Sequence, residues 1–182
     1  MAVQKINMPA AEFERFALLP ENADRLLELI DGEIIEVVSN GKSSAIGVYI
    51  GGVWAVFARQ NKLGFVTGAD GGYKIGRERY IPVCAFVSNK KQAKPSSDAY
   101  NAIPPDLVAE VLSPSNTPDE IAAKVDNFLR AGTVIWVVNP DAQRVTVHRP
   151  DAPPKTYGIN ETLDGGSVLP GFTLAVRDIF AE

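Results

Sequence analysis

Residues 107–112 read Leu-Val-Ala-Glu-Val-Leu, a nearly continuous apolar run that contains one charge, Glu110. Such a run is typical of a strand that is buried on both faces of a sheet. Alternation along a strand places Val108, Glu110 and Leu112 on one face. A buried ionised carboxylate costs several kcal/mol unless a cation or hydrogen-bond donors meet it. Glu110 is therefore either half of a structural ion pair or part of a functional site.

A helix is predicted directly after this strand. Residues 117–120 (Thr-Pro-Asp-Glu) combine an N-cap, a proline at the first helical position and a glutamate three residues after the cap, and Gly132 marks the helix end. Lys124 borders the apolar stripe of this helix, so its ammonium either extends to solvent or faces a carboxylate on the sheet. In the second case, Glu110 could hold Mg²⁺ while Lys124 orients the attacking water of a nuclease.

The rest of the chain predicts alternating strands and helices. Asp31-Gly32, between apolar runs at 25–30 and 33–38, predicts a hairpin because both turn positions need positive φ. Apolar residues at helical spacing predict a helix over 43–60. Further strands are expected at 65–66, 72–75, 80–87, 134–138 and 144–149, short helices at 10–18 and 175–180, and a polar, proline-bearing connection at 150–160. This order predicts one α/β domain over residues 1–182, with a mixed sheet flanked by helices.

Composition argues against several kinds of site. One cysteine, Cys84, allows neither an internal disulfide nor a cysteine-based metal cluster, and one histidine, His148, argues against two-histidine zinc sites. We interpret Cys84 as an apolar filler and His148 as a surface or packing residue. No apolar run reaches the length of a membrane span and no signal-peptide pattern occurs, so we expect a cytoplasmic protein.

The charge is acidic overall but uneven. The net charge is −4, which is not the positive field of a tight, non-specific DNA binder. Residues 74–94 nevertheless hold six basic residues and one acid. Within this segment Lys74, Arg77 and Arg79 are candidate contacts to nucleic-acid phosphates. The alternative is an ordinary solvated surface.

Several segments together resemble the Uma-two family, which is grouped with restriction endonucleases in the PD-(D/E)XK nuclease superfamily. The resemblance covers nearly the whole chain, from about residue 8 to about residue 180, and includes Lys124, Phe128 and Gly132. The matching segments are 26–34 (Leu-Leu-Glu-Leu-Ile-Asp-Gly-Glu-Ile), 81–87 (Ile-Pro-Val-Cys-Ala-Phe-Val), 105–115 (Pro-Asp-Leu-Val-Ala-Glu-Val-Leu-Ser-Pro-Ser), 136–140 (Trp-Val-Val-Asn-Pro) and 163–172 (Leu-Asp-Gly-Gly-Ser-Val-Leu-Pro-Gly-Phe).

The resemblance implies a restriction-endonuclease-like fold, Mg²⁺-dependent hydrolysis of DNA phosphodiesters, and often a homodimer. It places the metal-binding carboxylate of the strand at Glu110. It places the catalytic lysine at Lys124, on the following helix, because Leu112 holds the usual lysine position. A further catalytic acid would be Glu33, for which an exposed glutamate at a strand edge is the alternative.

One position departs from the family pattern. After Pro82 the pattern expects a metal-binding aspartate, and this chain has Val83. If 80–87 is one strand, Val83 extends an apolar stripe with Ile81, Ala85 and Val87, and Cys84 faces the other way. Valine has no oxygen, and Mg²⁺ takes hard oxygen ligands. Asp70 and Glu78 are the acids close enough in sequence to compensate; the alternative is that both lie on turns at the margin of the sheet.

Two further positions differ: Ser43 and Ser44 stand where relatives often carry a histidine, and Asn139 where many have aspartate. Two hypotheses follow. The chain is either a Mg²⁺-dependent endonuclease whose activity Val83 impairs, or an inactive nuclease-fold protein that acts as a nucleic-acid-binding or protein-interaction module.

Overall fold

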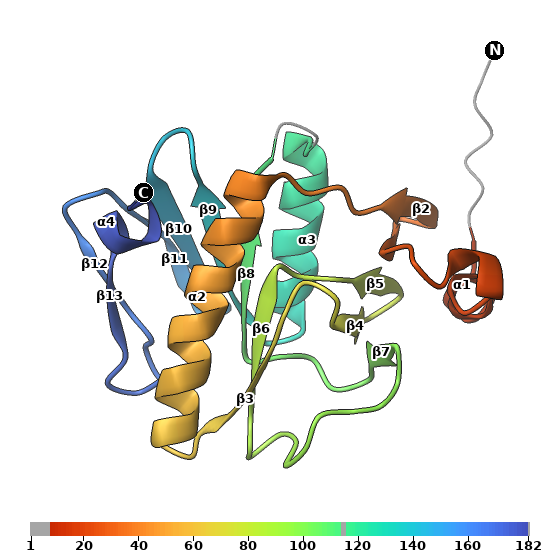
Figure 1. Cartoon of the computed structure of the whole chain (residues 1–182), viewed down its shortest axis with the longest axis horizontal. Coiled ribbons are helices and arrows are strands. Elements are labelled where there is room, and N and C mark those ends of the chain that lie inside the picture. The colour runs from red at the N-terminus through yellow and green to blue at the C-terminus, as the bar shows by residue number, and fades with distance from the viewer. Residues whose placement is uncertain (1–7, 114–115, 182) are drawn as a thin grey trace.

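The central strand of the computed structural model, which describes residues 8–113 and 116–181, is β8 (Leu107–Val111). It lies in a six-stranded sheet of order β11-β10-β9-β8-β6-β3 (Figure 1). β8 pairs in parallel with β9 (Val134–Asn139) and antiparallel with β6 (Cys84–Ser88). The outer strands are β3 (Gly64–Thr67), β10 (Arg144–Arg149) and β11 (Ala152–Tyr157). The predicted mixed sheet is confirmed.

A second sheet, of five strands, has the order β2-β1-β5-β4-β7. Its strands are β1 (Leu27–Ile30), β2 (Glu33–Glu36), β4 (Gly72–Ile75), β5 (Glu78–Tyr80) and β7 (Tyr100–Asn101). The predicted hairpin joins β1 to β2, and both turn residues have positive φ, 51° at Asp31 and 78° at Gly32. A small two-stranded sheet pairs β12 (Thr162–Asp164) with β13 (Thr173–Ala175).

The helices agree with the sequence-based expectations. They are α1 (Ala10–Ala17), α2 (Gly41–Gln60), α3 (Pro118–Arg130) and α4 (Val176–Ile179), with a 3₁₀ turn at Pro20–Asn22. The predicted capping box of α3 forms between Thr117 and Glu120. Among the described residues, none of the helices combines the length and the apolar character that a membrane crossing requires.

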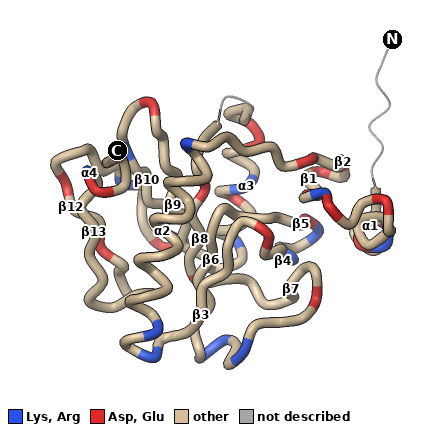
Figure 2. Tube along the Cα trace, in the orientation of Figure 1, with Lys and Arg blue, Asp and Glu red and all other residues tan. Residues whose placement is uncertain are grey.

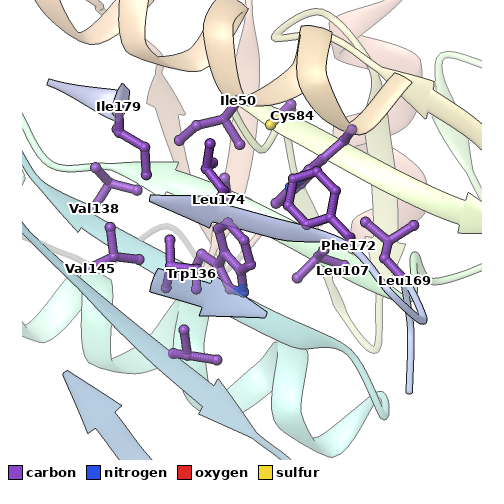
Figure 3. Close-up of a cluster of buried hydrophobic side chains, with 14 of the residues drawn as sticks. Ile50, Cys84, Leu107, Trp136, Val138, Val145, Leu169, Phe172, Leu174 and Ile179 are labelled. Atoms are coloured by element: carbon purple, nitrogen blue, oxygen red, sulfur yellow. The ribbon is translucent and has the colours of Figure 1, made fainter. Parts of the chain in front are cut away.

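Two apolar cores cover the two faces of the six-stranded sheet. On one face α2 and the C-terminal segments pack over the sheet, and Trp136, Phe172 and Leu174 lie in this core (Figure 3). On the other face α3 packs over β9, while Tyr73 and Tyr80 of the second sheet close the same core. Leu107, Ala109 and Val111 belong to the first core and Val108 to the second, as alternation predicts. Glu110 therefore points toward α3.

The prediction of one strand over 80–87 is wrong. The segment divides into β5 and β6, which belong to different sheets, because Pro82 has no N–H to donate to a continuous ladder. The predicted stripe of Ile81, Val83, Ala85 and Val87 is broken as well. Ala85 and Val87 face α3, whereas Val83 packs on the α2 side together with Cys84, which was expected to face the other way.

The polar stretch at 150–160 contains β11 rather than a plain connection. Pro153 and Pro154 lie in this strand, which occupies the edge of the sheet and pairs only with β10 among the described residues. An edge strand tolerates proline because the missing N–H faces solvent. Pro114 and Ser115, at the end of the matching segment 105–115, lie outside the described residues.

Candidate functional site

Three buried charges meet between the two sheets. Lys124 of α3 lies with its Nζ 3.4 Å from Glu110 Oε1 of β8, so the predicted pair forms. The same Nζ lies 2.9 Å from the carboxylate of Glu28 on β1. Glu28, Glu110 and Lys124 are 2%, 6% and 7% exposed, so solvent barely reaches them. We call these three residues the ion triad.

Glu28 is the member of the ion triad that sequence reasoning missed. Its carboxylate also accepts a 2.7 Å hydrogen bond from the backbone N–H of Ile81, so it is fixed by two donors. The signal that singled out Glu110 was present here too, since Glu28 is the one charge in the apolar run at 26–30. The family resemblance points instead to Glu33, past the turn, as the further acid.

The electrostatics of the ion triad follow from burial and from two acids sharing one base. The pKa of Glu110 is raised to about 7, because burial and the nearby Glu28 carboxylate raise it by more than Lys124 lowers it. Burial alone would lower the pKa of Lys124, but Glu110 and Glu28 together raise it, so the ammonium stays charged. The Lys124 Nζ also lies 5.5 Å from the centre of the Tyr80 ring.

Val83 stands beside this cluster, at the bend that precedes β6. The register pairs Cys84 with Ala109, so the position next along the strands brings residue 83 beside Glu110. The Val83 side chain packs against α2 at Gly47. A Cβ added to Gly47 would lie only 2.0 Å from Val83 Cγ1.

A pocket of about 550 Å³ opens between α2 and this bend. Val83 and Ser44, two positions where the family resemblance expects metal-binding or histidine side chains, both line it. The rest of the wall is mostly apolar or small, and includes Leu26, Gly47, Val48 and Gly51. We call it the α2 pocket.

The other predicted acids lie elsewhere. Glu33 is exposed at the start of β2, opposite Ile30. Asp70 is exposed on the turn before β4. Glu78 is buried, but its carboxylate accepts a 2.9 Å hydrogen bond from the backbone N–H of Asp31, and burial raises its pKa. The ion pairs found for Lys124 in the described structure join it to Glu28 and Glu110, not to these three acids.

The three predicted phosphate-contacting residues have different surroundings in the structure. Glu14 of α1 forms ion pairs with Lys74, at 2.9 Å, and with Arg79, at 2.5 Å. Arg79 is only 7% exposed, whereas Arg77 is exposed. Two of the three cations therefore have a structural partner, and their role as nucleic-acid contacts stays a prediction.

The two residues that we interpreted as non-catalytic have surroundings that fit that interpretation. Cys84 is 1% exposed, and burial together with the nearby Glu110 raises the pKa of its thiol, so little thiolate is available at neutral pH. His148 is half-buried, and burial lowers the pKa of its imidazole.

The fit of a divalent metal can be tested against the donors themselves. Mg²⁺ prefers octahedral coordination by oxygen ligands. Glu28 and Glu110 already share the Lys124 ammonium, and Val83 supplies no oxygen. Across residues 8–113 and 116–181, no three His, Cys, Asp or Glu side chains come together in a way that could hold a metal ion. The donor set therefore does not fit Mg²⁺.

Comparison with known proteins identifies the family. No curated protein matches the chain. Among solved structures, the chain is similar to a crystal structure described as a "putative nuclease belonging to DUF820" from Anabaena variabilis, with a TM-score of 0.82 and 22% identity over 95% of this chain and 97% of that one. This likeness shows the fold. The family model described as "Putative restriction endonuclease" matches residues 10–177, and the chain therefore belongs to the Uma2 family.

Proposed function

We propose that this chain, a member of the restriction-endonuclease family, is impaired in metal-dependent cleavage of DNA. One observation carries the proposal: the ammonium of Lys124 contacts both buried carboxylates, and Val83 holds the position where the family resemblance expects a metal-binding aspartate. A metal-dependent nuclease uses its metal to activate water and to neutralise phosphate charge. Here the Lys124 ammonium contacts both buried carboxylates and offsets one of their two negative charges.

A plasmid-nicking assay with Mg²⁺ or Mn²⁺ tests the proposal. We expect no nicking by the wild-type protein or by Glu110→Ala. We expect Val83→Asp to gain nicking, because it restores the carboxylate that the family pattern expects at this position, which is next to Glu110 in the strand register. Val83→Asn is the matched control, with nearly the same shape and no charge. Nicking by the wild type that Glu110→Ala abolishes would overturn the proposal, and a silent Val83→Asp would show that Val83 alone does not explain the loss.

The family implies DNA as the substrate. The family resemblance in the sequence also implies a homodimer, and the proposal includes both. A cytoplasmic location stays a prediction from the sequence. Lys124 would act on the phosphate only if its contact with one of the carboxylates were released, because both hold it in place.

A second candidate function is nucleic-acid binding without cleavage, favoured by a basic cluster at the end of α2. Arg59 and Lys62 are exposed there, and Lys90 and Lys94 are exposed on the loop after β6. Asn89 joins the two segments through hydrogen bonds to the backbone oxygens of Lys62 and Leu63, at 2.9 and 2.8 Å. Blue segments gather at this end of the molecule in Figure 2.

Fluorescence anisotropy with a labelled DNA duplex tests this candidate. We expect binding that weakens as salt rises, since cations on the protein displace counterions from the phosphates. The double change Lys62→Glu and Lys90→Glu should weaken binding by about tenfold or more at low salt. Lys155→Glu, an exposed lysine on β11, is the matched control. Equal affinity of all three proteins would contradict the candidate.

A further inference from the structure

The outward face of α2 is uncharged and uncovered. No Asp, Glu, Lys or Arg occurs from Ser43 through Ala58. The helix crosses the front of the molecule in Figure 1, and no other helix or strand lies over it there. Val48 is 73% exposed and Val56 58%. A surface helix is normally apolar on one side only, and a helix that is apolar all round is normally buried.

Gly52, at the middle of this face, has no role inside the chain. A Cβ added to Gly52 would meet no atom within 4 Å, whereas Gly47 and Gly51 leave room for Val83 and Cys84. Glycine is among the least favourable residues in a helix interior. A glycine without an internal neighbour is useful where the backbone of another helix approaches closely.

Two grooves flank the exposed face. One is the mostly apolar α2 pocket. The other, of about 540 Å³, lies between α2 and the C-terminal segment at Ile179 and Phe180, and its lining also includes Lys42, Gln143 and Asp178. Val38 and Leu26, 69% and 37% exposed, continue the apolar surface beside the first groove.

We propose that two copies of this chain pair through α2, with a two-fold axis near Gly52. Each copy then presents the same ridge to the other, as a closed two-fold interface requires. The Val48 and Val56 side chains of one copy enter the grooves of its partner. This contact covers the mouth of the α2 pocket, so the position of Val83, the residue that replaces the expected metal ligand, faces an apolar interface.

The absence of charge on the face fits a second copy better than an anionic partner, and the flanking grooves add to its area. A 20-residue helix is about 30 Å long and about 10 Å wide, which offers roughly 300 Å². The flanking grooves extend this area toward the roughly 800 Å² per partner of a stable complex. A nucleic acid or an anionic membrane would need cations on the face, and the nearest on α2, Lys42 and Arg59, lie outside the uncharged stretch.

Sedimentation velocity between about 1 and 100 µM protein, a range that spans ordinary dimer affinities, tests the proposal. We expect the wild type at twice the chain mass of 19.6 kDa. Val48→Glu and Gly52→Leu should each raise the dissociation constant by about tenfold or more. Leu18→Glu, on an exposed residue beyond α1, is the matched control and should keep the wild-type mass. Circular dichroism confirms that each variant is folded.

A disulfide provides a direct measure of proximity. Gly52→Cys should form a covalent dimer under mild oxidation, because the two copies of residue 52 meet at the axis. Leu18→Cys should stay monomeric on a denaturing gel, and the native Cys84 is too buried to react. A monomeric wild type at 100 µM, or a dimer that neither Val48→Glu nor Gly52→Leu weakens, would overturn the proposal. The inference rests on the homodimer included in the proposed function and names its interface. Cleavage activity does not enter these tests, so a failed dimer would leave the proposed loss of cleavage standing.

Discussion

Glu28 and Glu110 share one ammonium, and their surroundings are unequal. Glu28 has a backbone N–H in addition to Lys124, whereas the Lys124 contact to Glu110 is longer, at 3.4 Å. Two buried carboxylates and one ammonium leave one excess negative charge, which burial penalises. The raised pKa of Glu110 is the consequence, since protonating this carboxyl removes the excess charge.

This arrangement predicts a pH dependence of stability that belongs to Glu110. The folded-state pKa is raised to about 7 from 4.5, so between these values the folded protein keeps a proton that the unfolded chain loses. The stabilising contribution of Glu110 is therefore complete below pH 4.5, falls as pH rises, and is lost above about 7. Chemical unfolding of wild type and Glu110→Gln across this range measures it.

Relative to Glu110→Gln, the wild type should lose up to about 3 kcal/mol of unfolding free energy between pH 4.5 and 7.5. Glu21→Gln changes an exposed glutamate outside the ion triad and serves as the control, with a pH profile like that of the wild type. A difference between wild type and Glu110→Gln that does not change with pH would contradict this prediction.

Sequence reasoning at the residue scale found the partners that share one chain segment. Glu110 and Lys124 are 14 residues apart, on a strand and the helix that follows it, so the connection limits where they can lie. Glu28 comes from the other sheet, 96 residues away from Lys124. Its place in the ion triad depends on how the two sheets pack, which no local pattern in the sequence specifies.

At the scale of elements, α2 and the bend before β6 fit closely. Gly47 and Val83 touch so tightly that any side chain at position 47 would displace the Val83 side chain. The Val83 side chain therefore takes space that only a glycine on the helix leaves open. This contact accounts for the glycine at position 47, which helix propensity alone would disfavour.

A double-mutant cycle tests this contact. Gly47→Ala should destabilise the protein by about 1–2 kcal/mol, because the new methyl overpacks against Val83. In the background of Val83→Ala the same change should be neutral or stabilising by up to about 1 kcal/mol, because alanine favours the helix and the nearest remaining side-chain atom lies 3.5 Å away. Thermal or urea unfolding measures both steps. Additive effects of the two substitutions would contradict the contact.

The elements that the sequence predicted are those with a local chemical signal. The Asp31-Gly32 turn, the Thr117 cap and the apolar run of β8 each depend on adjacent residues, and all three appear in the structure. The break at Pro82 was missed because the apolar pattern of 80–87 continues through it. β11 was missed because its prolines resemble a loop, while edge pairing with β10 supplies the order.

At the scale of the whole molecule, the ion triad connects three layers. β1 belongs to the five-stranded sheet, β8 to the six-stranded sheet, and α3 packs between them. The core around it is apolar, so the three charges are satisfied chiefly by one another. The family membership and the fold follow from the sequence, whereas the use of the lysine as an internal counter-ion is visible only in the assembled structure.

The central claim is that this site does not hold a divalent metal, and direct Mn²⁺ binding tests it most simply. Electron paramagnetic resonance of Mn²⁺ titrated into the wild-type protein should show the signal of the free ion, with no stoichiometric binding at sub-millimolar concentrations, and Val83→Asp should bind more tightly. One Mn²⁺ bound tightly per wild-type chain, and lost in Glu110→Gln, would contradict the claim.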